Sequence, residues 1–425
     1  MKPPPPVTRI RSVFTTLAPS GLSYQALEAT SRCQHKPCAR IASDVHRRGR
    51  EGPDGAPSTR NEGDENGIPL IQRLASHATD GKIRLRNRHI GRCRVQCLRT
   101  ARQRNLAANI YLGSSTANRE RELQAAFDHI GLDKELSTPR KVFVKPNFTF
   151  PRPVPGVTTS REMLEDTLAL LVERGAEVFV GESNGGYGSF TAAEAFAGQG
   201  LFDMCKRTGA QPLDLSKCDL KEYSSTIGGK EVSVRLARML AEEMDFTVSL
   251  PVLKVHAMTT VSLSMKNLWG CYPTDLRLLE HKELDRKLAL ISKLIKARFG
   301  IVDATYGLDK HGPMEGEARF LGKFIASNDL LALDTACARM MGFSPSKLLH
   351  LRELAEFTGQ PLDSPTTSNE DLTTYNWGFS LQRDLIDSLS FLCFHSDTLA
   401  KVVFDSPFTP PIYAMLGRKP HRKLA

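Results

Sequence analysis

The stretch TTSREMLEDTLALLVERGAEVFVGES, residues 158–183, decides the fold. Its apolar residues recur at helical spacing after Thr159 and stop at Gly175, which predicts a helix that ends at a glycine. Thr159 and Glu162 fit a capping box at the helix start. The segments AEVFVGES at 176–183 and KVFVKPN at 141–147 predict strands on either side. Strand, helix and strand form a βαβ unit, so we expect these two strands to be parallel.

The alternation of strands and helices continues along the chain. Further strands are predicted at 211–216, 245–254, 300–307 and 322–329, and helices at 234–244, 284–299 and 329–343. This pattern predicts an α/β fold with a mostly parallel sheet flanked by helices over 107–360. We expect a small helical or irregular C-terminal appendage over 361–425 and a disordered N-terminal extension over 1–105.

The N-terminal extension carries the basic charge of the chain. Residues 1–105 hold 17 Arg, 3 Lys and 8 acidic residues, which leaves 37 basic and 39 acidic residues for the remainder. The extension lacks sustained apolar periodicity, as disordered segments do. A nucleic-acid-binding arm, a targeting peptide and a non-functional extension from a start codon assigned too far upstream all remain open. Because the remainder is nearly neutral, we expect no nucleic-acid partner for the folded part.

Composition also limits location and cofactors. The sequence shows no secretory signal and no run of about 18 apolar residues, so we expect a cytoplasmic protein without a transmembrane segment. The nine cysteines are scattered and include no ferredoxin motif. The cofactor stays unknown: a divalent metal and an iron–sulfur cluster are both left open. The oligomeric state is not indicated.

Polar side chains follow four of the predicted strands. Lys145 and Asn147 follow the first, Glu182 and Ser183 the second, Lys254 and His256 the third, and Asp303 the fourth. Ligands of open parallel sheets bind at the carboxyl ends of the strands, so these side chains predict a site there.

The third strand begins the segment LPVLKVHAMTTVSLSMKNLWGC, residues 250–271, which contains no carboxylate. If the strand continues through Lys254 and His256, both point to one side. If 259–268 is a helix, Thr259, Ser262 and Lys266 share a face. Two ammonium groups, hydroxyls and an imidazole would suit a carboxylate or phosphate.

Five segments together resemble the domain-of-unknown-function family 362. They are VFVKPNF, residues 158–183, the segment ending in KNLWGCYP, GIVDATYGLDKHGP and GKFIASNDLLALDTACARMMGF. The resemblance covers about 107–350 and implies no established reaction. Some family members carry ferredoxin-like segments or export signals, whereas this chain lacks the cluster cysteines. The resemblance implies functional strand-end positions at Lys145, Asn147, Glu182, Ser183, Lys254, His256, Lys266, Asn267 and Asp303, and family members commonly have Asp in place of Glu182.

We therefore expect an enzyme that acts on a small anionic substrate. Lys254 and Lys266 would clamp the anion and His256 would serve as general acid or base. The predicted substrate-binding residues are Lys145, Asn147, Ser183, Thr259 and Asn267, and the predicted metal ligands are Glu182 and Asp303.

Two alternatives remain beside the enzyme. One is an iron–sulfur-associated redox or maturation protein, and the other is a non-catalytic anion-binding module. Within the enzyme hypothesis, the order of strand-end lysine and histidine faintly resembles nickel-dependent lactate racemases, an analogy at the level of the fold.

Overall fold

The computed structural model describes residues 9–10, 107–186, 189–274, 277–383, 385–409 and 411. Of the predicted N-terminal extension only strand β1 is described; the rest, with its cysteines and arginines, lies outside the described residues. The strands are β1 (Arg9–Ile10), β2 (Ala108–Ser114), β3 (Lys141–Pro146), β4 (Glu177–Glu182), β5 (Gln211–Asp214), β6 (Leu220–Ile227), β7 (Lys230–Ala237), β8 (Phe246–Leu250), β9 (Val252–His256), β10 (Thr260–Ser262), β11 (Ala297–Asp309), β12 (Gly316–Ser327) and β13 (Thr366–Ser368).

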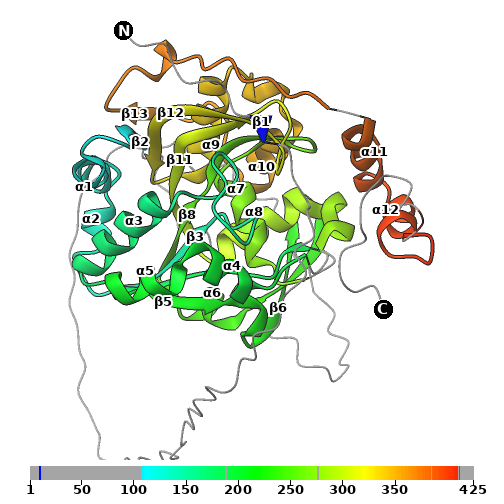
Figure 1. Ribbon diagram of the computed structural model, residues 1–425, viewed down its shortest axis with the longest axis horizontal. Coiled ribbons are helices and arrows are strands. Elements are labelled where there is room, and N and C mark those ends of the chain that lie inside the picture. The colour runs from blue at the N-terminus through cyan, green and yellow to red at the C-terminus, as the bar shows by residue number, and fades with distance from the viewer. Residues whose placement is uncertain are drawn as a thin grey trace, which may run out of the picture. The chain divides into compact units, whose positions relative to one another are not determined.

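The described α-helices lie between these strands and after the last one (Figure 1). They are α1 (Arg119–His129), α2 (Leu132–Glu135), α3 (Arg161–Glu173), α4 (Ala192–Gln199), α5 (Leu201–Thr208), α6 (Arg238–Glu242), α7 (Ser264–Asn267), α8 (Leu284–Leu294), α9 (Leu330–Met341), α10 (Leu349–Thr358), α11 (Leu385–Phe394) and α12 (Asp397–Phe404). None of the helices among the described residues has the length and apolar character needed to cross a membrane.

One large sheet organises the fold, in the order β13-β2-β12-β11-β8-β3-β4-β5. The pairings from β11 through β8, β3 and β4 to β5 are parallel, whereas β12 pairs antiparallel with both β11 and β2. The prediction of a mostly parallel α/β sheet is confirmed. β13 pairs parallel with β2, so the segment after residue 360 contributes a strand as well as helices.

Two apolar cores cover the two faces of the sheet. Val142 and Val144 of β3 belong to the core that contains α1, α3 and α5, whereas Phe143 belongs to the core that contains α8, α9 and α10. This division follows from the strand geometry, because successive side chains point to opposite faces. Figure 1 shows the helices on either side of the sheet. Because these strands are buried on both faces of the sheet, polar side chains are expected mainly at the carboxyl ends of the strands.

Three local predictions are wrong. Residues 245–254 form two strands, because Pro251 has no N–H to continue the ladder and its carbonyl accepts from Asp303 N–H at 2.8 Å. Residues 234–244 begin as strand β7, whose alternating buried side chains match a period of two. The capping box at Thr159 is absent: the helix cap is Ser160, and the Thr159 hydroxyl donates to Leu250 O and accepts from Asn147 N–H.

The predicted helix over 259–268 is also wrong, and this error matters for the site. β10 turns back and pairs antiparallel with β9, so that Ser262 lies opposite Lys254. The β-branched residues Thr259, Thr260 and Val261 favour extended backbone over helix. The described helical part of this segment is α7, four residues long, followed by a 3-10 helix that begins at Leu268.

Candidate active site

A buried ion pair joins the ends of β3 and β4. Lys145 Nζ lies 2.5 Å from Glu182 Oε2 and donates to Pro146 O at 2.6 Å. Lys145 is fully buried and Glu182 is nearly so. The other oxygen of Glu182 accepts from Ser183 N–H at 3.1 Å. The pair is therefore satisfied within the protein, as a buried charge must be.

Gly270 covers this ion pair. A Cβ added there would lie 2.3 Å from Glu182 Oε1 and 2.8 Å from Lys145 Nζ, so a larger residue would have to displace the ion pair or the backbone. The Gly270 carbonyl accepts from the Ser183 hydroxyl at 2.7 Å, and Arg277 donates to the same hydroxyl at 2.7 Å. The segment after α7 thus lies directly on the ends of β3 and β4.

Lys254, in the middle of β9, has no ion-pair partner among the described carboxylates. Its Nζ is nearly fully buried and donates to Val157 O at 3.0 Å and to the Thr149 hydroxyl at 3.3 Å. Burial, followed by the charges of Lys266 and Lys145, lowers the pKa of Lys254 to about 7, against the attraction of Glu182.

His256 and Lys266 contact each other. Lys266 Nζ lies 2.9 Å from His256 Nε2, and Met258 N–H donates to His256 Nδ1 at 3.1 Å. Burial lowers the pKa of Lys266 to about 7, against the attraction of Asp285. Burial, followed by the charges of Lys266 and Lys254, also holds the pKa of His256 well below its usual range. We call Lys145, Glu182, Lys254, His256 and Lys266 the lysine cluster.

The predicted amide residues hold the backbone around the lysine cluster. Asn267 donates to Lys145 O at 2.7 Å and to the Ser249 hydroxyl at 3.1 Å, tying α7 to β3 and β8. Asn147 accepts from Thr149 N–H at 3.2 Å and so shapes the loop whose Thr149 hydroxyl meets Lys254. Both amides are buried.

Two predicted residues are engaged elsewhere. Asp303 Oδ2 accepts from the backbone and the hydroxyl of Ser160, at 2.8 and 2.7 Å, and Oδ1 accepts from Thr305 N–H at 2.9 Å. Asp303 therefore anchors the start of α3. The Thr259 hydroxyl donates to Val261 O at 2.8 Å, within the turn before β10.

Residues far along the chain add a second layer that the sequence did not indicate. His350 Nδ1 hydrogen-bonds Asp285 Oδ1, joining α10 to α8. His350 Nε2 is buried without a hydrogen-bond partner among the described residues. Asp285 attracts the charge of Lys266, and His350 and His281 disfavour a charge on His256. Asp285, His281 and His350 act on the lysine cluster only because of the tertiary fold, so no local sequence motif could have predicted their role.

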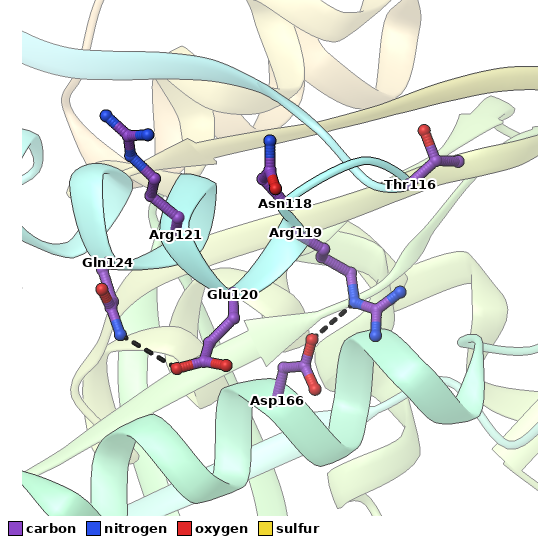
Figure 2. A pocket seen from close by; sticks show the side chains of 7 residues that line it. All are labelled: Thr116, Asn118, Arg119, Glu120, Arg121, Gln124 and Asp166. Carbon is purple, nitrogen blue, oxygen red and sulfur yellow. Dashed lines mark hydrogen bonds and ion pairs between the residues drawn. The ribbon is translucent and has the colours of Figure 1, made fainter.

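A surface hollow of about 420 Å³ lies apart from this chemistry. Figure 2 shows its walls, which come from the start of α1 and from α3. Arg119 pairs with Asp166 at 2.6 Å, and Gln124 donates to Glu120 at 3.1 Å. No residue of the lysine cluster lines it. Four of its polar side chains are bonded to one another in these two contacts, and we place the candidate site at the lysine cluster instead.

The residues present give little support for a metal centre. Among the described residues no group of three or more His, Cys, Asp and Glu side chains is placed to hold a metal ion. The five described cysteines, at positions 205, 218, 271, 337 and 393, are free and scattered over the fold. Glu182 and Asp303 each use both oxygens in the contacts above, and their role as metal ligands stays a prediction.

Comparisons with known proteins give one matching family model and one similar curated protein. Residues 142–339 match the model of a family described as "Domain of unknown function (DUF362)", which confirms the resemblance over those residues. The thylakoid-associated protein sll1697 of Synechocystis is 26% identical over 251 residues, which cover 56% of this chain and 75% of that protein.

Two solved structures are similar at lower identity. The lactate racemase apoprotein of Thermoanaerobacterium thermosaccharolyticum matches with a TM-score of 0.35 and 13% identity, over 55% of this chain and 57% of that one. A structural-genomics protein from Thermotoga maritima matches with a TM-score of 0.32 and 14% identity, over 56% of this chain and 59% of that one. The chain thus spans less than two thirds of either structure, and likenesses of this size carry no argument for racemase chemistry.

Proposed function

Starting from the match of residues 142–339 to the DUF362 family, we propose that the chain is an enzyme acting on a small anionic substrate. The substrate carries a carboxylate or a phosphate and binds at the lysine cluster. The observation that supports this most is the pair of buried amines, Lys254 and Lys266, without a described carboxylate at ion-pair distance. A bound anion would supply the missing negative charge.

The two amines explain why an anion is favoured over a cation or a neutral ligand. With pKa values of about 7, Lys254 and Lys266 carry little net charge above neutral pH. An anion beside them raises both pKa values, because an opposite charge favours the protonated form. Binding is therefore coupled to proton uptake, and the protonated amines donate charge-assisted hydrogen bonds.

The other predicted residues have supporting roles in this proposal. His256 acts in acid–base chemistry through its contact with Lys266. The Lys145–Glu182 pair, Asn147, Asn267 and Ser183 form the walls, since their polar atoms are already bonded to the protein. Thr259 shapes the turn that carries β10 back over Lys254. We keep the cytoplasm as the proposed location.

Titration calorimetry tests the proposal with inorganic phosphate and oxalate as probes. At pH 8, in two buffers of different ionisation enthalpy, we expect binding with uptake of up to two protons. Lys254→Met should remove most of the affinity and one of the protons, while Lys206→Met, at an exposed helix position, should change neither. Binding without proton uptake, or equal affinity in Lys254→Met, would contradict the proposed site.

Enzyme and binding module differ in one further result. A non-catalytic module would be stabilised thermally by phosphate or oxalate, as any ligand of the native state does. It would convert no substrate. A screen of small carboxylates and phosphate esters, followed by mass spectrometry of the products, separates the two, because only an enzyme changes the mass or isomer of one of them.

A further inference from the structure

The hydrogen bonds of His256 fix which of its nitrogens carries the proton. Met258 N–H donates to Nδ1 at 3.1 Å, and a backbone N–H can only donate. Nδ1 therefore presents its lone pair. The ring is neutral, so its one hydrogen lies on Nε2.

This tautomer determines the state of Lys266. Nε2–H points at Lys266 Nζ, 2.9 Å away, and must donate to it. An ammonium group has three donors and no acceptor, whereas a neutral amine has a lone pair. The geometry therefore requires Lys266 to be a neutral amine when the site is empty of substrate.

The surroundings favour the same state. Lys266 is buried, and its pKa is lowered to about 7. The charged and titratable groups that act on this pair are Lys254, Asp285, His281 and His350. Asp285 alone favours the charged form of Lys266, and it is already bonded to His350. A neutral lysine amine in a buried site is a nucleophile towards carbonyl carbon.

We propose that Lys266 forms an imine with a substrate that carries both an aldehyde or ketone and an anionic group, of which a small oxo acid is the simplest kind. Nζ attacks the carbonyl carbon, the N–C bond forms, and the two hydrogens of Nζ leave with the carbonyl oxygen as water. No oxidant, reductant or other co-reactant enters. The anionic group of this substrate lies against Lys254, which takes up the proton, so Lys266 keeps its lone pair for the attack. The inference rests on the proposed function and adds the reactive half of the substrate.

Reductive trapping on the full chain tests this step. Glyoxylate and pyruvate are each added with sodium borohydride, and the adduct is located by peptide mass spectrometry. We expect one adduct per chain, on Lys266. Its neutral fraction at pH 7.5 exceeds that of an ordinary lysine by roughly 600-fold, given reference values near 10.4. The yield should therefore rise with pH through about 7 and level off above about pH 8, one unit above the pKa of Lys266.

Variants separate this reaction from surface labelling. Lys266→Arg keeps a basic side chain but has no reactive amine, and should abolish the adduct. Lys206→Arg, in an exposed ion pair with Asp203, should leave it unchanged. If Lys266→Arg proves unfolded by circular dichroism, Lys266→Met replaces it, because Met has a similar volume and no charge to bury.

The outcomes are distinct. An adduct spread over several lysines, or one that persists without Lys266, overturns the inference. If phosphate and oxalate bind through Lys254 but neither carbonyl probe gives an adduct, the imine is wrong and the anion site stands. If neither anions nor carbonyl probes engage the wild-type chain, the proposed function itself fails.

Discussion

Lys145 and Lys266 both belong to the lysine cluster, but Lys145 contacts a carboxylate and Lys266 contacts an imidazole. Lys145 is fully buried beside Glu182 at 2.5 Å and forms an ion pair. Lys266 is buried beside His256 at 2.9 Å, without a described carboxylate at ion-pair distance. Burial is similar, so the nearest partner decides the protonation state. One end of the cluster holds a structural ion pair, and the other holds an amine that is available for chemistry.

The largest expected effect comes from removing one half of the structural pair. Lys145→Met leaves Glu182 buried and unpaired, which costs about 3–5 kcal/mol of the free energy of unfolding. Urea denaturation at pH 7.5 measures it. Asp203→Ala, which breaks an exposed pair with Lys206, is the control and should change stability little. A loss as small as that of the control would show that the Lys145–Glu182 pair carries no buried charge.

Gly270→Ala tests how closely the segment after α7 lies on the same pair. The added Cβ would lie 2.3 Å from Glu182 Oε1, so the pair or the backbone must move. We expect a loss of about 1–3 kcal/mol, the usual cost of overpacking. Combining Gly270→Ala with Lys145→Met should cost less than the sum of both, because the methionine no longer needs the ion-pair geometry. Strict additivity in denaturation experiments would contradict this contact.

The free energy of unfolding should rise with pH between about 7.5 and 8.5. Lys254 and Lys266 have folded pKa values of about 7, below their unfolded values near 10.4, so the unfolded state binds more protons in this window. The slope is about 1 kcal/mol per pH unit for each lysine. Well below pH 7 both lysines are protonated in the folded and in the unfolded state, and the full cost of burying their charges lowers the free energy of unfolding. The double variant Lys254→Met and Lys266→Met should show a nearly flat profile; a slope equal to wild type would exclude the lowered pKa values.

The smallest expected loss of stability comes from Lys266→Met. Methionine replaces a neutral amine of similar volume, and the unfolded state no longer gains by protonating a lysine there, so the variant should lose no stability at pH 7.5. The matched comparison is Lys145→Met, with the same substitution in the same cluster. Denaturation curves that show equal losses for the two variants would mean that Lys266 is paired as Lys145 is.

The sequence predicts the strands and helices that carry the site better than it predicts the contacts between the site's side chains. The βαβ unit at 141–183 follows from local periodicity and is confirmed, and Lys145 and Glu182 lie at strand ends as predicted. Lys254 instead lies inside β9, which continues to His256. The ends of parallel strands meet at one edge, so their convergence could be expected. Which side chain each lysine contacts could not be predicted. Lys145 and Lys266 are both lysines in apolar segments, and their ion pairing depends on the distance between segments that are far apart in the chain.

The hairpin of β9 and β10 shows a second limit. Residues 259–268 carry apolar and polar residues at helical spacing, and the predicted helix gave Thr259, Ser262 and Lys266 a common face. The antiparallel pairing of β10 with β9 overrides that spacing. Asp285 and His350 illustrate the same limit, since α8 and α10 bring them to Lys266 through tertiary packing alone.

The state of His256 and Lys266 is measured most directly by nitrogen NMR of the full chain labelled with ¹⁵N-histidine and ¹⁵N-lysine. The account predicts that His256 carries its proton on Nε2 and none on Nδ1, and that Lys266 Nζ titrates near pH 7, well below the ordinary value near 10.4. The signals are assigned with His256→Gln and Lys266→Met. An Nδ1-protonated or doubly protonated His256, or a Lys266 that titrates near 10.4, would contradict it.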